Sequence, residues 1–191
     1  NTERMKQMKK HIPVPASLPA RLIAYAIDWY LSAMLFAVSI SLFASIEAGD
    51  LILTNTITIL SFPSACGALA IGIVLVLFYY CYPILLKKNE GQTIGKHILG
   101  IRIIKADQTP LSIKDYLLRY LLGMILIEQN MNMCSFMIRS VLGMVIPSLI
   151  VSIVYDIGVV LCLISVVLVF GKQHRMIHDR IAHTIVVPNK P

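Results

Sequence analysis

Three long apolar blocks constrain this chain more than any other feature of its sequence. They cover residues 22–46, 57–86 and 140–170, and they contain one, no and one charged residue respectively. A helix needs about 20 apolar residues to cross roughly 30 Å of hydrocarbon. The first two blocks therefore each predict one membrane-spanning helix. The third block is too long for one comfortable span.

The distribution of Lys and Arg predicts the orientation. Residues 1–21 carry five of these bases, residues 87–110 carry five and residues 172–191 carry four, whereas residues 22–86 carry none. Short loops rich in Lys and Arg remain in the cytoplasm. We therefore expect a multi-pass protein of the cytoplasmic (cell) membrane, with both termini and the 87–110 loop inside and residues 47–56 outside.

The same charges indicate the partners. The net charge of +7 suits anionic lipid headgroups on the cytoplasmic side, at about 1 kcal/mol for each basic residue near the surface. Nucleic acid is not expected as a partner, because the bases are dispersed between the apolar blocks. A homo-oligomer or a larger membrane assembly is compatible with so small a chain.

The sequence offers no chemistry typical of an enzyme. The GQTIGK segment at 91–96 is not a phosphate-binding loop, since that motif needs four residues between its glycines and a Ser or Thr after the Lys. We find no nucleophile–base pair, no cofactor loop and no convincing set of metal ligands. We therefore expect no catalytic residue, no cofactor and no metal.

Two arrangements are open for the second half of the chain. Residues 112–128 can form an amphipathic helix in the cytoplasmic interface, which keeps Arg139 inside and makes residues 140–170 a hairpin that turns at 155–158. Alternatively the segment crosses the membrane, which places Glu128 and Arg139 outside and leaves one long span. We prefer the interfacial arrangement because it keeps Arg139 on the basic side.

The expected fold is an all-α integral membrane protein with about four transmembrane helices, an amphipathic interfacial helix and a small cytoplasmic β pairing. The pairing joins two runs rich in β-branched residues, at 100–104 and 183–188. A single membrane domain at 20–188 follows a basic cytoplasmic segment at 1–19 and precedes a tail at 189–191. The predicted spans are about 20–46, 57–86, 136–155 and 157–171, and the interfacial helix is about 112–128.

Asp28 is the most informative single residue, because it lies within the first apolar block. A carboxylate at the centre of a membrane helix costs about 2.5–3.5 kcal/mol on insertion scales. Arg21 and Asp28 lie on one helical stripe but two turns apart, so a direct pair between them would be strained. We expect a bridging group such as Arg119 or Arg180. Asp28 is then an ion or proton site, a structural polar contact between helices, or a contact with a lipid headgroup.

These residues carry a resemblance to a known family. Arg21, Asp28 and Asp179, the last within HDRIAHTIVV, resemble the Arg-Asp-Asp signature of the RDD family of membrane proteins. GQTIGKHILGIRI resembles the TxGKxxxGxRV segment of that family, and LLRY with Arg119 resembles its later arginine. The resemblance covers roughly residues 19–188.

The resemblance implies a membrane protein thought to transport unknown ligands, and it defines the class better than the function. The first hypothesis is a small cation- or proton-coupled transporter that uses Asp28 as its titratable site. The alternative is a non-catalytic accessory or regulatory subunit of a larger membrane complex. The candidate ligand, ion or structural cluster comprises Arg21, Asp28, Arg119, Asp179 and Arg180.

Overall fold

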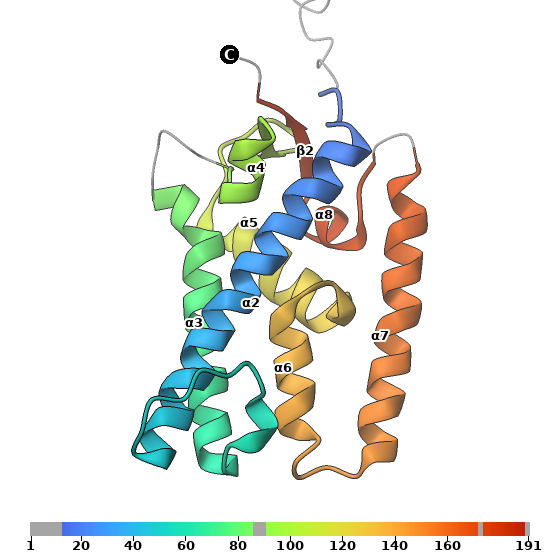
Figure 1. Cartoon of the computed structure of the whole chain (residues 1–191). Helices are drawn as coiled ribbons and strands as arrows, with labels where there is room; N and C mark the ends of the chain where they lie inside the picture. Colours follow the sequence, from blue (N-terminus) through green and yellow to red (C-terminus); the bar gives the residue numbers. More distant parts are fainter. Residues whose placement is uncertain (1–12, 86–90, 172–173, 190–191) are drawn as a thin grey trace, which may run out of the picture.

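The computed structural model describes residues 13–85, 91–171 and 174–189 (Figure 1). The first twelve residues of the predicted basic segment at 1–19 and the last two of the tail at 189–191 lie outside these ranges. Most of the described residues are helical. A pair of short strands lies at one end of the long helices.

Three helices are long and apolar enough to cross a membrane, namely α2 (Leu18–Ala48), α3 (Phe62–Leu85) and α7 (Ser148–Val169). Helix α2 ends at Gly49, whose φ of 71° is the left-handed conformation that glycine adopts without steric cost. A loop containing the 3₁₀ turn η1 (Ile57–Ile59) then leads into α3, which runs antiparallel to α2. The first two predicted spans are therefore observed as helices.

The two β-branched runs pair as predicted. Strand β1 (Ile101–Lys105) is antiparallel to β2 (Thr184–Pro188), with Ile103 opposite Val186. Two short helices, α4 (Ile94–Ile98) and α8 (Ile177–Ile181), lie beside these strands. We call this part of the molecule the sheet end (Figure 1). It joins segments that are about 80 residues apart in the sequence.

The segment from 113 to 142 differs from the preferred prediction. Helix α5 (Ile113–Leu117) continues into the π-helix η3 (Leu118–Ile127), the turn η4 (Gln129–Met131) and helix α6 (Met133–Leu142). This composite segment runs from the sheet end to the opposite end of the molecule (Figure 1). The structure therefore favours the crossing arrangement over a helix that lies flat at one end.

The hairpin predicted at residues 155–158 is wrong, and so are the spans predicted at 136–155 and 157–171. Helix α7 is continuous through 155–158, and the chain reverses instead at 143–147, just before the helix begins. Gly158 serves packing rather than a turn, because a Cβ there would lie 3.1 Å from the Gln129 side chain.

Arg139 consequently lies at the opposite end from the sheet, in the last turn of α6. Its guanidinium carbon is 5.0 Å from the centre of the Tyr155 ring, a distance at which a cation is attracted to an aromatic face. Arg139 therefore has an aromatic contact at the end of the molecule where the charge distribution alone would not place an arginine.

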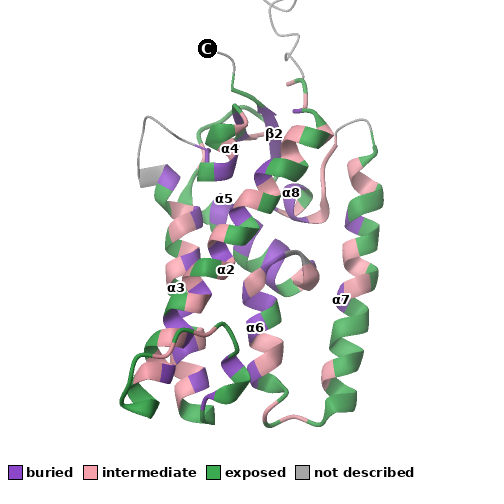
Figure 2. Ribbon diagram, in the orientation of Figure 1, coloured by how far each residue is buried: buried purple, intermediate pink, exposed green. Residues whose placement is uncertain are grey.

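The long helices expose much of their apolar surface (Figure 2). Helix α7 is the extreme case, because its buried residues are Gly158 and Ser165. An exposed apolar surface of this length suits contact with lipid chains rather than water. The contacts that hold α7 to the rest of the protein are mainly with η4.

The charge distribution and the fold together predict the sidedness of three loops. In a variant from which Cys66, Cys81, Cys134 and Cys162 are replaced, a cysteine at Asn55 or Val145 should react with a membrane-impermeant thiol reagent from outside intact cells. A cysteine at Ala106, between the predicted cytoplasmic strands, should react only after permeabilisation. Val145 is decisive, because protection of that position from outside reagent would favour the interfacial arrangement of residues 112–128.

Candidate functional site

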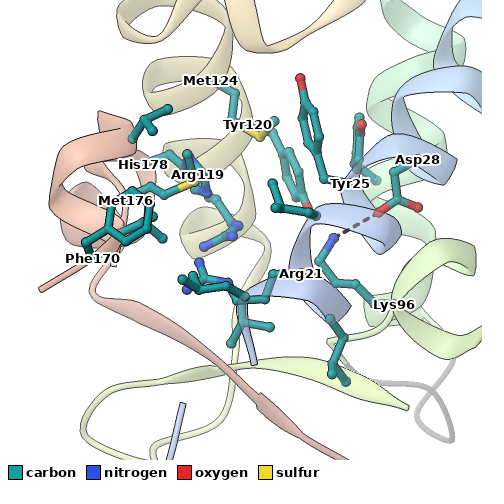
Figure 3. A pocket seen from close by; sticks show the side chains of 17 residues that line it. Arg21, Tyr25, Asp28, Lys96, Arg119, Tyr120, Met124, Phe170, Met176 and His178 are labelled. Carbon is teal, nitrogen blue, oxygen red and sulfur yellow. Dashed lines mark hydrogen bonds and ion pairs between the residues drawn. The ribbon is translucent and has the colours of Figure 1, made fainter. Parts of the chain in front are cut away.

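Asp28 lies nearly three turns into α2, and the residue is only 2% exposed. It pairs with none of the arginines in the part of the chain that the structure describes. Its partner is Lys96 of helix α4, whose Nζ lies 2.9 Å from Asp28 Oδ2. The predicted bridging arginine is therefore replaced by a lysine that belongs to the GQTIGK segment. Figure 3 shows this ion pair at one side of a cavity.

Three further donors complete the surroundings of the Asp28 carboxylate. The Tyr79 hydroxyl donates to Oδ1 at 2.6 Å, and the Thr93 hydroxyl donates to Oδ2 at 2.5 Å. The backbone N–H of Gly95 also donates to Oδ1, at 2.9 Å. Hydrogen bonds and an adjacent cation are what a buried carboxylate needs to remain ionised.

Gly95 explains how α4 comes so close to α2. A Cβ at this position would lie 2.8 Å from Asp28 Oδ1 and would also overlap the carbonyl oxygen of Ala24. Glycine is therefore needed for close backbone approach rather than for a turn. Asp28 in return accepts one of the N–H groups at the start of α4 that have no partner within the helix.

Asp179 is the centre of a second charge group at the sheet end, and it is fully buried. Arg119 from η3 contacts its Oδ1, and Arg21 Nη2 from α2 lies 2.9 Å from its Oδ2. The same carboxylate accepts the backbone N–H of Met176 at 3.1 Å, at the start of α8. Arg119 also donates to the Thr184 hydroxyl at 2.6 Å. One carboxylate thus ties together α2, η3 and α8.

Glu128 and His178 form a third buried pair that the sequence analysis did not identify. The Nδ1 atom of His178 lies 2.7 Å from Glu128 Oε2. The other carboxylate oxygen accepts the Ser165 hydroxyl at 2.6 Å and the backbone N–H of His178 at 2.8 Å. His178 Nε2 is 3.7 Å from Asp179 Oδ2, so the pair adjoins the second charge group. Ser165 brings α7 into this network.

Burial and neighbouring charges shift the pKa values of Lys96 and Asp179, and the effect that prevails differs between them. Burial lowers the pKa of Lys96, against the effect of the Asp28 carboxylate. Burial alone would raise the pKa of Asp179, but the adjacent Arg119, His178 and Arg21 outweigh that effect and hold this pKa well below its usual range. A depressed carboxyl pKa stabilises the fold above the unfolded-state value of about 3.9, and this stabilisation is lost as the pH falls further.

A cavity of about 270 Å³ lies between these groups. Arg21, Asp28, Lys96, Arg119 and His178 all line it, together with apolar residues from α2, η3 and α7. In Figure 3, Asp28 and Lys96 lie on one side of the cavity, and Arg21, Arg119 and His178 lie on the other. The arrangement presents separated charges to a partly open, mostly apolar space.

Four of the five sequence-predicted site residues lie in these two groups. Arg180 does not. Its side chain is exposed, and its Nε donates to the carbonyl oxygen of Arg175 at 3.4 Å. Of these two neighbours in α8, Asp179 faces the protein interior and Arg180 faces outward.

The residues of the network that the sequence analysis missed include Tyr79, Thr93, Lys96, Glu128 and His178. Thr93 and Lys96 could have been found, because both belong to the TIGK segment that resembles the family motif, and His178 could have been found because it opens the HDRIAHTIVV segment. Glu128 carried no comparable signal. Glu128 and His178 are 50 residues apart and are brought together only by the packing of η3 against α8.

The fold and the buried charges define a helical membrane protein with ionised groups packed between its apolar helices. The model of the RDD family matches residues 15–183, which is most of the chain. The chain therefore belongs to the RDD family. Neither the curated proteins nor the solved structures gave a match.

The two-arginine contact of Asp179 predicts a large effect on stability. Asp179→Asn should destabilise the protein by about 3–5 kcal/mol, because it leaves two buried arginines without their carboxylate. Arg180→Gln and Asp107→Asn change exposed residues and should melt at the wild-type temperature. Thermal unfolding in detergent measures all three. A wild-type melting temperature for Asp179→Asn would show that the charge group does not hold α2, η3 and α8 together.

Proposed function

We propose that the protein is a small, non-enzymatic transporter of the cell membrane in which a monovalent cation or a proton exchanges with Lys96 at Asp28. The supporting observation is the position of the Lys96 ammonium. It lies 2.9 Å from Asp28 Oδ2 and 3.1 Å from the Thr93 hydroxyl oxygen, so two oxygen atoms surround one positive charge. Hard cations prefer such oxygen ligands.

The exchange follows from charge balance. Asp28 is too deeply buried to remain ionised without a positive partner. An incoming cation can take the place of the ammonium, or a proton can neutralise the carboxylate, and either event frees Lys96. The freed ammonium remains beside the cavity, which Lys96 lines. The carboxylate is thus never left alone with an uncompensated charge.

The same exchange affects helix α4. Asp28 holds the start of α4 through the Gly95 N–H and holds its interior through Lys96. Loss of the Lys96 contact weakens the attachment of α4 to α2. Because α4 lies at the sheet end, on the proposed cytoplasmic side, its release would admit water to Asp28 from that side. Coupling between occupancy and access is the minimum requirement for a carrier.

The second candidate is an accessory subunit of a larger membrane assembly, or a subunit of a homo-oligomer. Helix α7 favours it, because nearly all of that helix is open to a neighbouring helix as well as to lipid. In this case the buried charge groups serve only to hold the helices together. The two candidates differ in whether the isolated protein moves ions.

Flux from purified protein in liposomes tests the proposal. Wild-type protein should move Na⁺, K⁺ or H⁺ down an imposed gradient, and Asp28→Asn should abolish the flux while remaining folded. Lys96→Met should lower the half-saturating cation concentration about tenfold or more, because a cation no longer has to displace an ammonium; tenfold corresponds to about 1.4 kcal/mol. Flux by fluorescent pH dyes and radioactive cations gives both quantities.

Asp107→Asn is the matched control, since it removes a carboxylate that is exposed and caps a turn at Thr109. It should leave flux unchanged. Thermal melting must accompany each flux measurement, because a misfolded Asp28→Asn protein says nothing of transport. Folded Asp28→Asn protein with wild-type flux would exclude Asp28 as the site. Wild-type liposomes without flux of any of the three ions would favour the accessory subunit.

A further inference from the structure

Much of the cavity wall is apolar and has no part in the proposed cation exchange at Asp28. Its apolar lining connects α2 with α7, two helices that do not pack closely against each other at this level (Figure 1). Leu22 of α2 and Val166 and Phe170 of α7 line the cavity and are also exposed on the outer surface. In a membrane this outer surface faces lipid chains. The cavity is therefore accessible from the bilayer.

Two arginines that line this cavity share one carboxylate. Arg21 and Arg119 both contact Asp179, whereas Lys96 pairs with Asp28. The neighbouring Glu128 carboxylate contacts His178 and Ser165. The two arginines therefore have one carboxylate between them as a contact partner.

Arg119 supplies a specific unused donor. Its side chain is 4% exposed and lines the cavity, yet its Nε has no hydrogen-bond partner among the described residues. Arg119 Nη1, in contrast, contacts both Asp179 and Thr184. A buried N–H without an acceptor costs about 1–3 kcal/mol. An anionic oxygen in the cavity would remove this cost.

We propose that this cavity binds an anionic amphiphile from the bilayer, with its phosphate or carboxylate at Arg119 and Arg21 and the start of one acyl chain between Leu22, Val166 and Phe170. A volume of about 270 Å³ is near the lower limit of ligand pockets, roughly 300–1,000 Å³. It accommodates the acidic group and the first carbons, and the remainder of the chain extends between α2 and α7 into the hydrocarbon. This site shares its cavity with Asp28 and Lys96 but contacts the amphiphile through other residues.

The apolar lining favours an amphiphile over a free anion. A small soluble anion would satisfy Arg119 but would place its other side against Leu22 and Val169, whose side chains offer no hydrogen bond to replace its solvation. An acyl chain covers those side chains instead and gains roughly 0.8 kcal/mol for each buried methylene. A lipid and a free anion would both present an acidic oxygen group to Arg119. They differ in whether binding requires an acyl chain.

Native mass spectrometry of delipidated protein tests the site. Phosphatidylglycerol should bind one molecule per protein in clear preference to phosphatidylcholine, and inorganic phosphate at millimolar concentration should compete poorly. Val166→Trp places a large ring in the cavity and should weaken phosphatidylglycerol binding at least about tenfold, or about 1.4 kcal/mol. The substitution leaves the charged residues of the cavity unchanged.

Val167→Trp is the matched control, because the neighbouring Val167 is exposed and does not line the cavity. It should bind phosphatidylglycerol as the wild type does, and the melting temperature of both variants should show that α7 is intact. Equal binding by Val166→Trp and Val167→Trp would overturn the proposal. So would equal affinity for phosphatidylcholine, or full displacement of the lipid by inorganic phosphate, which would indicate a site for a free anion.

Discussion

The rest of the structure depends on one constraint: each of two buried carboxylates must have its own cationic partner. Asp28 and Asp179 lie in or beside apolar helices, and each needs a cation and several hydrogen-bond donors to remain ionised there. The donors come from α3, α4, η3, α8 and α2. The two carboxylates therefore determine which segments of the sheet end dock against the long helices, and in what register.

This constraint explains why small residues occur where the short helices dock. Gly95 allows the start of α4 to reach Asp28, and Gly123 allows η3 to approach His178, where a Cβ would lie 2.6 Å from that side chain's own Cβ. The strand pair then fixes the order of these elements, because β1 follows α4 directly and β2 follows α8. Close backbone contact, ion pairs and strand pairing thus support one arrangement of the sheet end.

The same arrangement leaves a cavity between the buried charge groups. Arg21, Lys96 and Arg119 line it, and the Nε atom of Arg119 has no hydrogen-bond partner among the described residues. Helix α7 closes one side of that cavity and is attached mainly through η4 and through Ser165. The cavity therefore lies between the bonded short helices and the long helix that buries the fewest of its residues.

The sequence by itself determined the membrane class, the first two long helices, the strand pairing and the choice of Asp28 as a charge within an apolar helix. These conclusions depend on local composition, on periodicity and on the cost of charge in an apolar segment, which are readable along the chain. Asp179 was selected through the resemblance to the Arg-Asp-Asp signature of the RDD family, which also supported the choice of Arg21 and Arg119. The tertiary structure decided the partner of Asp28, the burial of Glu128 with His178 and the exposure of Arg180. It also decided the course of residues 113–142 and the uninterrupted helix through 155–158. The physical reason is that these roles depend on contacts with distant segments. Gly158 is typical of a turn by its residue type, but it packs against Gln129 inside a helix. Glu128 is typical of a loop, but it is buried as the ion-pair partner of His178.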